Sequence, residues 1–357
     1  MQPLLDPVYI NGCPIGPGHR PYIVAEMSGN HNGDINRAYR LIDAARNTGA
    51  NAVKIQTYRP DTITINHDSP EFTVSGGLWD GRRLYELYEE AHTPWEWHES
   101  LFSYARQIGI TIFSSPFDPT AVDLLEKLDA PAYKIASPEL IDLPLIRRVA
   151  KTGKPIIIST GMGSEIEIGE AIEAARCAGA KQIIILHCTA AYPTPPNEAN
   201  LSRIPEIAKK YNVIAGLSDH SMGHIISTIS VGFGACFIEK HFTLDRFEGG
   251  VDSQFSMEPS ELKALVDSVA IAHSAIGSPA FEPTASEVSV LKNRRSLYVV
   301  EPVLKGQIFT ENNIRSIRPG NGMKPKYYDV ILGRSATRDL VFGEPLNKTM
   351  VEGFSCD

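Results

Sequence analysis

The amino-acid sequence predicts an α/β protein, a (β/α)8 TIM barrel followed by a small C-terminal domain. Three observations support this fold class. Eight β-rich runs alternate with helical patterns from Tyr22 to about residue 275, and the runs are almost continuously apolar. After Gly277 the pattern changes to short β-rich runs, many turn residues and a Pro/Gly-rich centre. Apolar strands of this kind are typical of a parallel sheet buried on both faces. Eightfold alternation over about 250 residues is typical of a TIM barrel.

The eight candidate strands follow one another along the chain. They are YIVAE (22–26), NAVKIQ (51–56), ITIFSS (110–115), AYKIAS (132–137), PIIIST (155–160), QIIILHC (182–188), NVIAGLS (212–218) and ACFIEKHF (235–242). Amphipathic helices are expected between most of them, for example at 35–50, 165–180 and 261–277. Because periodicity cannot establish closure, an open doubly wound sheet is the alternative, although no GxGxxG motif follows the first strand.

Four segments are expected from end to end. Residues 1–20 predict a hairpin that turns at Asn11–Gly12 and caps the bottom of the barrel. The barrel itself is expected at 21–278, a linker at 279–290, and a small domain of short strands and turns at 291–357. The connection between the second strand and Trp95, about 37 residues long, predicts a functional loop, since structureless links of this length are uncommon in compact domains.

Composition excludes several classes of protein. The 357 residues carry a formal net charge of −8, which makes nucleic acid a poor partner because phosphate binding needs an excess of Lys and Arg. No stretch of about 18 apolar residues predicts a membrane span, and the N-terminus lacks the features of a signal peptide. The five cysteines, Cys356 among them, are scattered without CxxC spacing, so we expect a reduced, cytoplasmic setting.

Polar side chains gather at the carboxyl ends of the predicted strands, where TIM-barrel active sites lie. The strand-end candidates, in chain order, are Glu26, Lys54, Gln56, Ser115, Lys134, Ser137, Glu139, Ser159, Tyr192, Ser218, His220, Glu239 and His241. Residues two apart on a strand share a face, so Ser218 with His220 and Glu239 with His241 are expected to point the same way. Ionisable groups in apolar strands are costly to bury alone, which favours a functional site over isolated core residues.

His220 and His241 are the candidate metal ligands. They end adjacent predicted strands, and neutral imidazole binds zinc, manganese and similar divalent ions. Two protein ligands leave coordination positions open, which suits Lewis-acid catalysis better than a structural site. The alternative is that the two histidines are general acids or phosphate binders. His31 is a weaker candidate, and His187 is expected to face the helices.

Lys54 and Lys134, with neighbouring serines, are suited to binding a phosphate or carboxylate. Each serine could instead be a helix N-cap, and either lysine could form a Schiff base as in aldolases. Glu26 is a candidate general acid or base, although a carboxylate that simply pairs with Lys54 would look the same in sequence.

The same residues lie in strings that resemble the sialic acid synthase family over residues 20–350. The strings are AEMSGNHNG (25–33), VKIQTY (53–58), FSSPFD (113–118), AYKIAS (132–137), STGM (159–162), LHCTAAYPTP (186–195), GLSDHSMG (216–223), IEKHFTLD (238–245) and RPGNG (318–322). The tail resembles the small antifreeze-protein-like (SAF) domain of these enzymes. Segments 54–64 and 76–98 are most similar to the pseudaminic acid synthases within the family.

The resemblance implies a condensation of phosphoenolpyruvate with an open-chain amino-sugar aldehyde, with release of phosphate by C–O cleavage. It implies a divalent cation, manganese first and magnesium or cobalt as alternatives, held by His220 and His241. Residues matching the phosphoenolpyruvate-binding positions are Lys54, Lys134, Ser115, Ser137, Ser159 and Ser218. Glu26 and Glu139 match acidic residues near the reacting centre.

The sugar-contacting positions of the family are matched by Gln56, Tyr192 and Asp252. Arg318 matches an arginine that the small domain of one subunit inserts into its partner's barrel, which implies a domain-swapped homodimer. Ala190 stands where the sialic acid branch has an asparagine, and the 76–98 block also differs from that branch. Both departures favour a more apolar 2,4-diacetamido-6-deoxy sugar. Trp79 and Leu78 could pack on its methyl groups, or they could instead anchor the loop.

Three other readings stay open at this point. The chain could make N-acetylneuraminic or legionaminic acid by the same reaction. It could be a Schiff-base aldolase that uses Lys134 or Lys54. It could also be a sugar-binding protein that works through the small domain alone.

Overall fold

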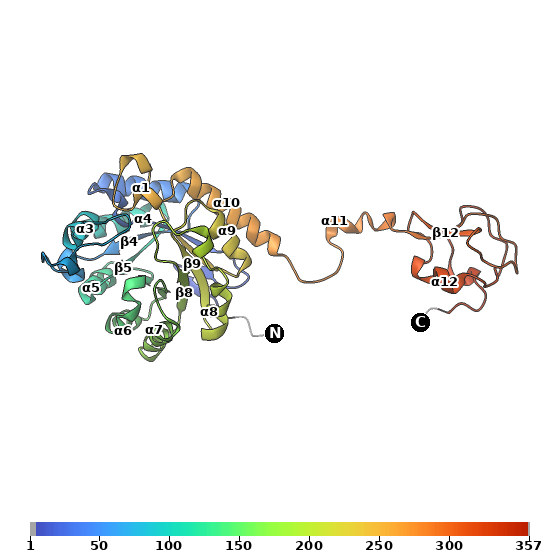
Figure 1. The fold of residues 1–357 in the computed structure, drawn as a ribbon, viewed down its shortest axis with the longest axis horizontal. Coiled ribbons are helices and arrows are strands. Elements are labelled where there is room, and N and C mark those ends of the chain that lie inside the picture. The colour runs from blue at the N-terminus through green and yellow to red at the C-terminus, as the bar shows by residue number, and fades with distance from the viewer. Residues whose placement is uncertain (1–4, 356–357) are drawn as a thin grey trace. The chain divides into compact units, whose positions relative to one another are not determined.

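The computed structural model describes residues 5–355, which form two compact units. The first unit is a closed barrel of parallel strands surrounded by helices, visible around the central strands in Figure 1. Residues 1–4 of the predicted N-terminal cap, and residues 356–357 of the predicted small domain with Cys356, lie outside the described residues. Among the helices that are described, none is long and apolar enough to span a membrane.

Eight parallel strands make the barrel, in the order in which they occur in the chain. They are β3 (Tyr22–Glu26), β4 (Ala52–Thr57), β5 (Thr111–Pro116), β6 (Tyr133–Ile135), β7 (Ile156–Ser159), β8 (Ile183–Cys188), β9 (Ile214–Asp219) and β10 (Phe237–His241). The last strand pairs with the first, from Phe237 opposite Tyr22 to His241 opposite Glu26. This pairing closes the sheet, so the prediction of a TIM barrel is confirmed over the open sheet.

Helices cover the outer face of the strands. Their bounds are α1 (Ile35–Thr48), α4 (His98–Ile108), α5 (Pro119–Lys127), α6 (Leu143–Ala150), α7 (Glu165–Cys177), α8 (Arg203–Tyr211), α9 (Ile225–Gly232) and α10 (Pro259–Ile276). Side-chain caps begin several of them: Asp34 accepts from the backbone N–H of Asn36 at 2.9 Å, and Asp118 from that of Thr120 at 2.7 Å. These caps satisfy backbone donors that the first turn leaves without partners.

The interior of the barrel is closed at its lower end by a hairpin. Strand β1 (Val8–Ile10) pairs antiparallel with β2 (Cys13–Ile15) through a two-residue turn in which Asn11 and Gly12 both have positive φ, 51° and 79°. Such a turn favours Asn-Gly. The side chains of Val8 and Ile10 are buried in one apolar cluster with barrel residues such as Phe237. The hairpin therefore caps the lower end of the barrel. The charged side chains inside the barrel lie toward the opposite end.

The long connection after β4 is structured. It contains α2 (Pro60–Ile63) and α3 (Leu84–Ala91), and a short antiparallel bridge joins Thr73 to Arg83. Leu87 and Ala91 are buried on the inner side of α3. The segment is thus a folded cover on the barrel mouth rather than a disordered loop.

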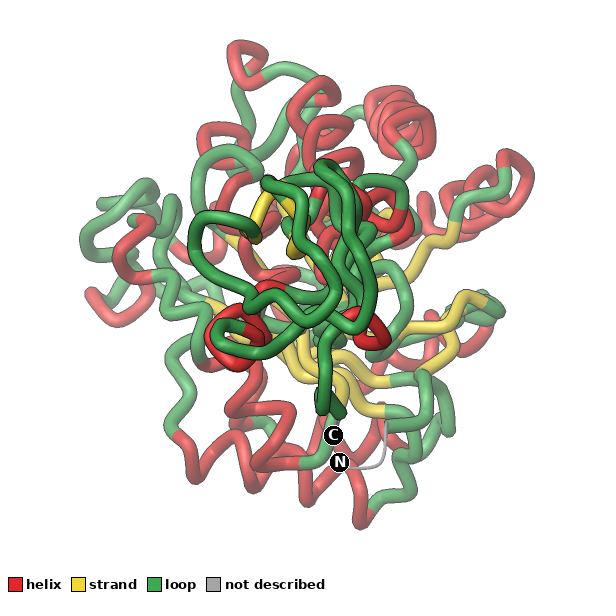
Figure 2. The backbone as a smooth tube through the Cα atoms, turned by 90° about the vertical axis from the view of Figure 1, so that its right-hand side faces the viewer, coloured by secondary structure: helices red, strands yellow, loops and turns green. Residues whose placement is uncertain are grey.

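The chain divides after Gly277 into its second unit. This unit contains α11 (Ala285–Val288), β11 (Ser296–Val299), β12 (Ile314–Ile317) and α12 (Tyr328–Ile331), and loops make up most of it (Figure 2). Its own core is a cluster that includes Leu297, Phe309 and Leu346, all fully buried. The segment predicted as a linker, 279–290, contains the single-turn helix α11.

Candidate active site

A cavity of about 470 Å³ opens at the carboxyl ends of the barrel strands. Twelve of the fifteen residues predicted for the site line it: Lys54, Gln56, Lys134, Ser137, Glu139, Ser159, Tyr192, Ser218, His220, Glu239, His241 and Asp252. They come from six different strands or the loops that follow them, so only the closed barrel brings them together. This is the usual position of a TIM-barrel active site.

The floor of the cavity is a buried network of two lysines and two glutamates. Lys134 Nζ lies 3.2 Å from Glu239 Oε1, and Lys54 Nζ lies 3.6 Å from the same oxygen. Lys54 also pairs with Glu26, which does not line the cavity but lies beneath it. All four groups are at most 5% exposed. Buried charges of this kind persist only where partners compensate the loss of water.

Burial and pairing shift the proton affinities of this floor in different directions. Burial raises the pKa of Glu26 to about 7, against the attraction of Lys54. Burial also lowers the pKa of Lys134, whereas for Lys54 the pairing with Glu239 and Glu26 outweighs burial and raises its pKa. Glu239 sits between both ammonium groups, which together outweigh burial and lower its pKa. The charge that can be offered to an anionic ligand is therefore carried by Lys54, with Lys134 beside it.

His220 and His241 face each other at the mouth, with ring centroids 5.3 Å apart. The Nδ1 atom of His220 lies 3.1 Å from the carbonyl oxygen of Thr189. When Nδ1 donates to that carbonyl, Nε2 is left with its lone pair free. His241 Nδ1 lies 3.7 Å from Asp252 Oδ2, and burial lowers the pKa of His241 well below its ordinary value. In its neutral form each ring can donate a lone pair, and His241 is held in that form, whereas contact with Cys188 outweighs burial and raises the pKa of His220.

This pair fits a divalent cation as an incomplete ligand set. Among the described residues no three His, Cys, Asp or Glu side chains group closely enough to hold a metal by themselves. However, His241 Nδ1 is buried without a hydrogen-bond partner, as is Glu239 Oε2. Buried polar atoms in native proteins normally have partners, so the orphan nitrogen points to a missing one. Two imidazoles that leave coordination positions open suit a catalytic ion better than a structural one.

The hydroxyl groups of several serines complete the polar wall. Ser137 Oγ accepts from the backbone N–H of Gly161 at 3.0 Å, and Ser159 Oγ is buried without a partner. Ser115 Oγ accepts from Lys54 Nζ at 3.1 Å and does not line the cavity. The helices next in sequence have other caps, such as Asp118 and Ser164, so the N-cap alternative fails for these serines. They are left available for a ligand or for Lys54.

Glu139 stands apart from the paired glutamates of the floor. Burial raises its pKa to about 7, and its Oε2 atom has no hydrogen-bond partner. A carboxyl group with this pKa exists in both protonation states near neutral pH, which is the property of a general acid or base.

The opposite wall of the cavity is apolar. It is formed mainly by the connection after β4, through Ile63, Val74, Trp79, Leu84, Leu87, Tyr88 and Ala91. The Trp79 ring lies 5.6 Å from that of Tyr192, and its Nε1 donates to the carbonyl oxygen of Val251 at 2.9 Å. Leu78, predicted alongside Trp79, does not line the cavity. The cavity therefore has a charged half and a hydrophobic half.

Other candidates lie elsewhere. His187 Nε2 contacts the carbonyl oxygen of Ala199 at 2.7 Å, so it faces the helices as expected. His31 is fully buried behind the site, against the Trp97 ring, and burial lowers its pKa to about 4. Arg318 belongs to the second unit, where it is exposed just after β12.

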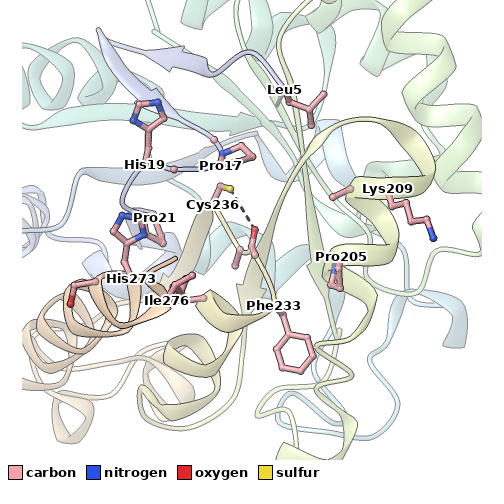
Figure 3. Close-up of a pocket in the computed structure, with 18 of the residues that line it drawn as sticks. Leu5, Pro17, His19, Pro21, Pro205, Lys209, Phe233, Cys236, His273 and Ile276 are labelled. Atoms are coloured by element: carbon pink, nitrogen blue, oxygen red, sulfur yellow. Dashed lines mark hydrogen bonds between the residues drawn. The ribbon is translucent and has the colours of Figure 1, made fainter. Parts of the chain in front are cut away.

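A second cavity, of about 720 Å³, lies at the other end of the barrel (Figure 3). Its walls come from the loop before β3, including Pro17 and His19, and from the ends of α8, α9 and α10. Most of its surface is apolar, as Figure 3 shows for Phe233 and Ile276. It lacks the paired charges of the upper cavity, so we place the chemistry at the upper one.

Sequence reasoning missed some residues of the upper cavity. Tyr58 lines it and lies two residues beyond Gln56, so the same alternation that indicated Lys54 would have found it. Leu84, Leu87 and Tyr88 share one side of α3 at helical spacing. Nothing in the sequence marks that side as facing a cavity rather than a core.

Comparisons with known proteins agree with this architecture. Residues 41–280 match the model of the NeuB family, and residues 294–352 match the SAF domain. A pseudaminic acid synthase of Campylobacter jejuni is 44% identical, covering 92% of this chain and 96% of that protein. An N,N'-diacetyllegionaminic acid synthase of the same organism is 37% identical, over 89% and 96%.

A solved structure gives the same result at the level of the fold. The N-acetylneuraminic acid synthetase of Leptospira borgpetersenii, crystallised with citrate, superimposes with a TM-score of 0.73 at 31% identity, covering 82% of this chain and 97% of that one. The chain belongs to the NeuB family, the family of sialic acid synthases that its strand-end strings resemble.

Proposed function

We propose that the chain is a pseudaminic acid synthase. It condenses phosphoenolpyruvate with 2,4-diacetamido-2,4,6-trideoxy-L-altrose, giving pseudaminic acid and phosphate. The observation that carries this proposal is the divided cavity: buried lysines and a histidine pair on one side, and an apolar wall on the other. The 44% identity to the Campylobacter enzyme, against 37% to the legionaminic acid synthase, supports this sugar over its relatives.

The charged half of the cavity is the proposed site for phosphoenolpyruvate. Lys54 and Lys134 supply positive charge to phosphate and carboxylate, and Ser137, Ser159 and Ser218 supply hydroxyl donors. Glu26 and Ser115, beneath the cavity, hold the Lys54 ammonium group in place. Glu239 contacts both lysines and orients them before substrate arrives. An anion that binds here competes with Glu239 for these two ammonium groups.

His220 and His241 are the proposed holders of a divalent cation, manganese first and magnesium or cobalt as alternatives. When bound there, such an ion supplies Lewis-acid chemistry for the aldehyde of the sugar. Carbon 3 of phosphoenolpyruvate forms the new C–C bond to the aldehyde carbon, water adds at carbon 2, and phosphate leaves by cleavage of its C–O bond. Glu139, with a pKa of about 7, can take the proton of the attacking water and return it to a departing oxygen.

The apolar half is the proposed site for the sugar substituents. Trp79, Val74 and Leu87 offer surface for methyl groups, such as those of two acetamido groups and carbon 6 of a deoxy sugar. Gln56, Tyr192 and Asp252 line the same cavity and are the proposed polar contacts of the sugar. A sugar with a hydroxyl on carbon 6 would leave that hydroxyl without a partner against this wall.

We further propose that the enzyme works as a domain-swapped homodimer in the cytoplasm, in which Arg318 enters the partner's barrel. Residues 291–357 carry eleven Lys or Arg and seven Asp or Glu, whereas residues 1–290 carry 23 and 35. These opposite net charges favour association of one chain's small unit with a barrel. None of the described residues that line the upper cavity is an arginine, so an arriving Arg318 would add the planar, bidentate anion contact.

The outer face of α9 also supports a second copy. Met222, Ile225, Ile229 and Phe233 recur at helical spacing and are 39–62% exposed, whereas the inner face carries buried serines. An exposed apolar stripe of this kind marks an interaction surface.

Phosphoenolpyruvate labelled with ¹⁸O at the bridging oxygen tests the proposed chemistry. C–O cleavage sends the label into phosphate, and we expect this result with manganese and the altrose substrate. Label retained in the sugar acid would exclude the proposed route. The competing Schiff-base aldolase requires a covalent adduct on Lys54 or Lys134, which borohydride would trap with substrate present.

A further inference from the structure

A second pair of buried charges lies behind the two histidines. Lys240 on β10 and Asp219 on β9 are opposite each other in the strand register, and each comes one residue before a candidate metal ligand. Lys240 Nζ lies 3.2 Å from Asp219 Oδ2, and the two residues are 1% and 4% exposed. Because side chains alternate along a strand, His220 and His241 face the cavity while this pair faces the helices.

The pair is tied to the backbone on the far side of His220. Asp219 Oδ1 accepts from the backbone N–H of Ser221 at 2.8 Å, and Lys240 donates to the carbonyl oxygen of Ser221. Ser227, on the inner face of α9, donates to Asp219 Oδ2 at 2.5 Å. His220 therefore stands between two residues that the network holds from both sides.

Further hydrogen bonds hold the backbone and the ring of His220 in place. Its carbonyl oxygen accepts from the backbone N–H of Thr194 at 3.0 Å, and its ring contacts the Thr189 carbonyl oxygen. On the neighbouring strand, His241 follows directly after Lys240, and its carbonyl oxygen accepts from Met257 N–H at 2.8 Å. The ion pair is a side-chain link that joins these two strands directly before the two histidines.

Stability alone does not explain this arrangement. Removing a lysine and an aspartate from water is expensive, and apolar pairs of similar volume often replace buried ion pairs at no loss of stability. An apolar pair could not hydrogen-bond to the backbone N–H and carbonyl oxygen of Ser221. It also could not fix the position of β9 relative to β10 through a directional contact. The directional contacts of the pair are what apolar packing cannot supply.

We propose that the buried Lys240–Asp219 pair positions His220 and His241 relative to each other, and so sets the affinity of the site for a divalent cation. The inference rests on the proposed cation site and adds two positioning residues to it. Loss of such outer contacts typically weakens metal binding 10- to 100-fold. Lys240 and Asp219 do not touch the ion or the substrates.

The test is the manganese dissociation constant of the full-length protein without substrates, measured by electron paramagnetic resonance of the free ion. Lys240→Met and Asp219→Asn should weaken binding by about 10-fold or more. The double variant Asp219→Leu/Lys240→Met restores an uncharged, packed pair. It should recover the unfolding midpoint while manganese binding stays weak.

Val269→Ala is the matched control, since Val269 is a fully buried core residue of α10 that contributes nothing to the upper cavity. It should lower the unfolding midpoint and leave manganese affinity unchanged. Wild-type affinity in Lys240→Met and Asp219→Asn, with only a lower unfolding midpoint, would overturn the proposal. His220→Ala separates a failure of the cation site from a failure of the positioning role. Unchanged manganese binding in that variant would show that manganese binds elsewhere, which overturns the cation site itself.

Discussion

His220 and His241 lie at the ends of neighbouring strands, and their ring centroids are 5.3 Å apart in the upper cavity. Replacing either with alanine removes one of two protein ligands. We therefore expect His220→Ala and His241→Ala to lower bound manganese and turnover together, by about 100-fold or more, since outer contacts alone account for 10- to 100-fold. Metal analysis after dialysis, alongside steady-state phosphate release, measures both quantities.

His19→Ala is the control for this pair, because His19 is exposed at the opposite end of the barrel. It should keep wild-type metal content and turnover. Full turnover of His220→Ala after treatment with a chelator would rule out the histidine pair as the metal site.

Glu139 gives a pH dependence whose sign follows from burial. Its pKa is raised from 4.5 to about 7 in the folded protein, so the folded state binds the proton more tightly than the unfolded chain. Its contribution to stability is fully present below pH 4.5 and is lost as the pH rises toward 7, by about 3 kcal/mol at most. Glu139→Gln cannot lose a proton and should become more stable than the wild type as the pH rises.

Denaturant unfolding of both proteins between pH 4.5 and pH 8 measures this difference. Glu167→Gln is a suitable comparison, since the Glu167 carboxylate accepts hydrogen bonds at the start of α7 and its pKa is lowered instead. A constant difference between Glu139→Gln and wild type across this range would contradict a raised pKa at Glu139.

At the scale of elements, strand alternation carried most of the prediction. Ser218 with His220, and Glu239 with His241, were expected on one face because they lie two residues apart, and all four line the cavity. The depth of each residue could not be predicted this way. Glu26 and Ser115 have the right parity but lie beneath Lys54, because depth depends on strand stagger around the closed barrel.

The connection after β4 could be recognised as functional only by its length. Its contact with the site depends on tertiary packing, seen where Trp79 Nε1 donates to the carbonyl oxygen of Val251. This bond joins the connection to the loop that carries Asp252. The apolar wall and the polar sugar contacts are thus fixed together.

Trp79→Ala tests the wall as a sugar-binding element. We expect the KM for the amino sugar to rise by about tenfold or more, equivalent to about 1.4 kcal/mol of lost contact, while the KM for phosphoenolpyruvate stays near wild type. Leu78→Ala, the neighbouring residue that does not line the cavity, should change neither. Equal increases in both KM values would argue against a separate sugar side of the cavity.

At the scale of the whole molecule, closure and assembly exceed what periodicity can predict. Eight alternating units are compatible with an open or a closed sheet, and only the register between β10 and β3 distinguishes them. The small unit has its own core around Leu297 and Phe309, so its sequence specifies its fold independently of where it binds. The role of Arg318 in a partner's barrel therefore needs a test of its own.

Subunit complementation provides that test. Arg318→Ala and His220→Ala should each be nearly inactive alone. If Arg318 acts on the partner's barrel, a random mixture forms hybrid dimers with one complete site and recovers about a quarter of wild-type activity. No recovery after confirmed subunit exchange would mean that Arg318 serves its own chain or has no role in catalysis.

Phosphate release from phosphoenolpyruvate across a panel of amino-sugar aldehydes shows which sugar this enzyme condenses. The panel contains 2,4-diacetamido-2,4,6-trideoxy-L-altrose, its manno-configured isomer and N-acetylmannosamine, each with manganese. We expect the highest kcat/KM for the altrose compound, by about 100-fold over N-acetylmannosamine, because the wall around Trp79 leaves a carbon-6 hydroxyl unpaired. Faster release with N-acetylmannosamine, or no release with any member of the panel, would contradict the proposed function.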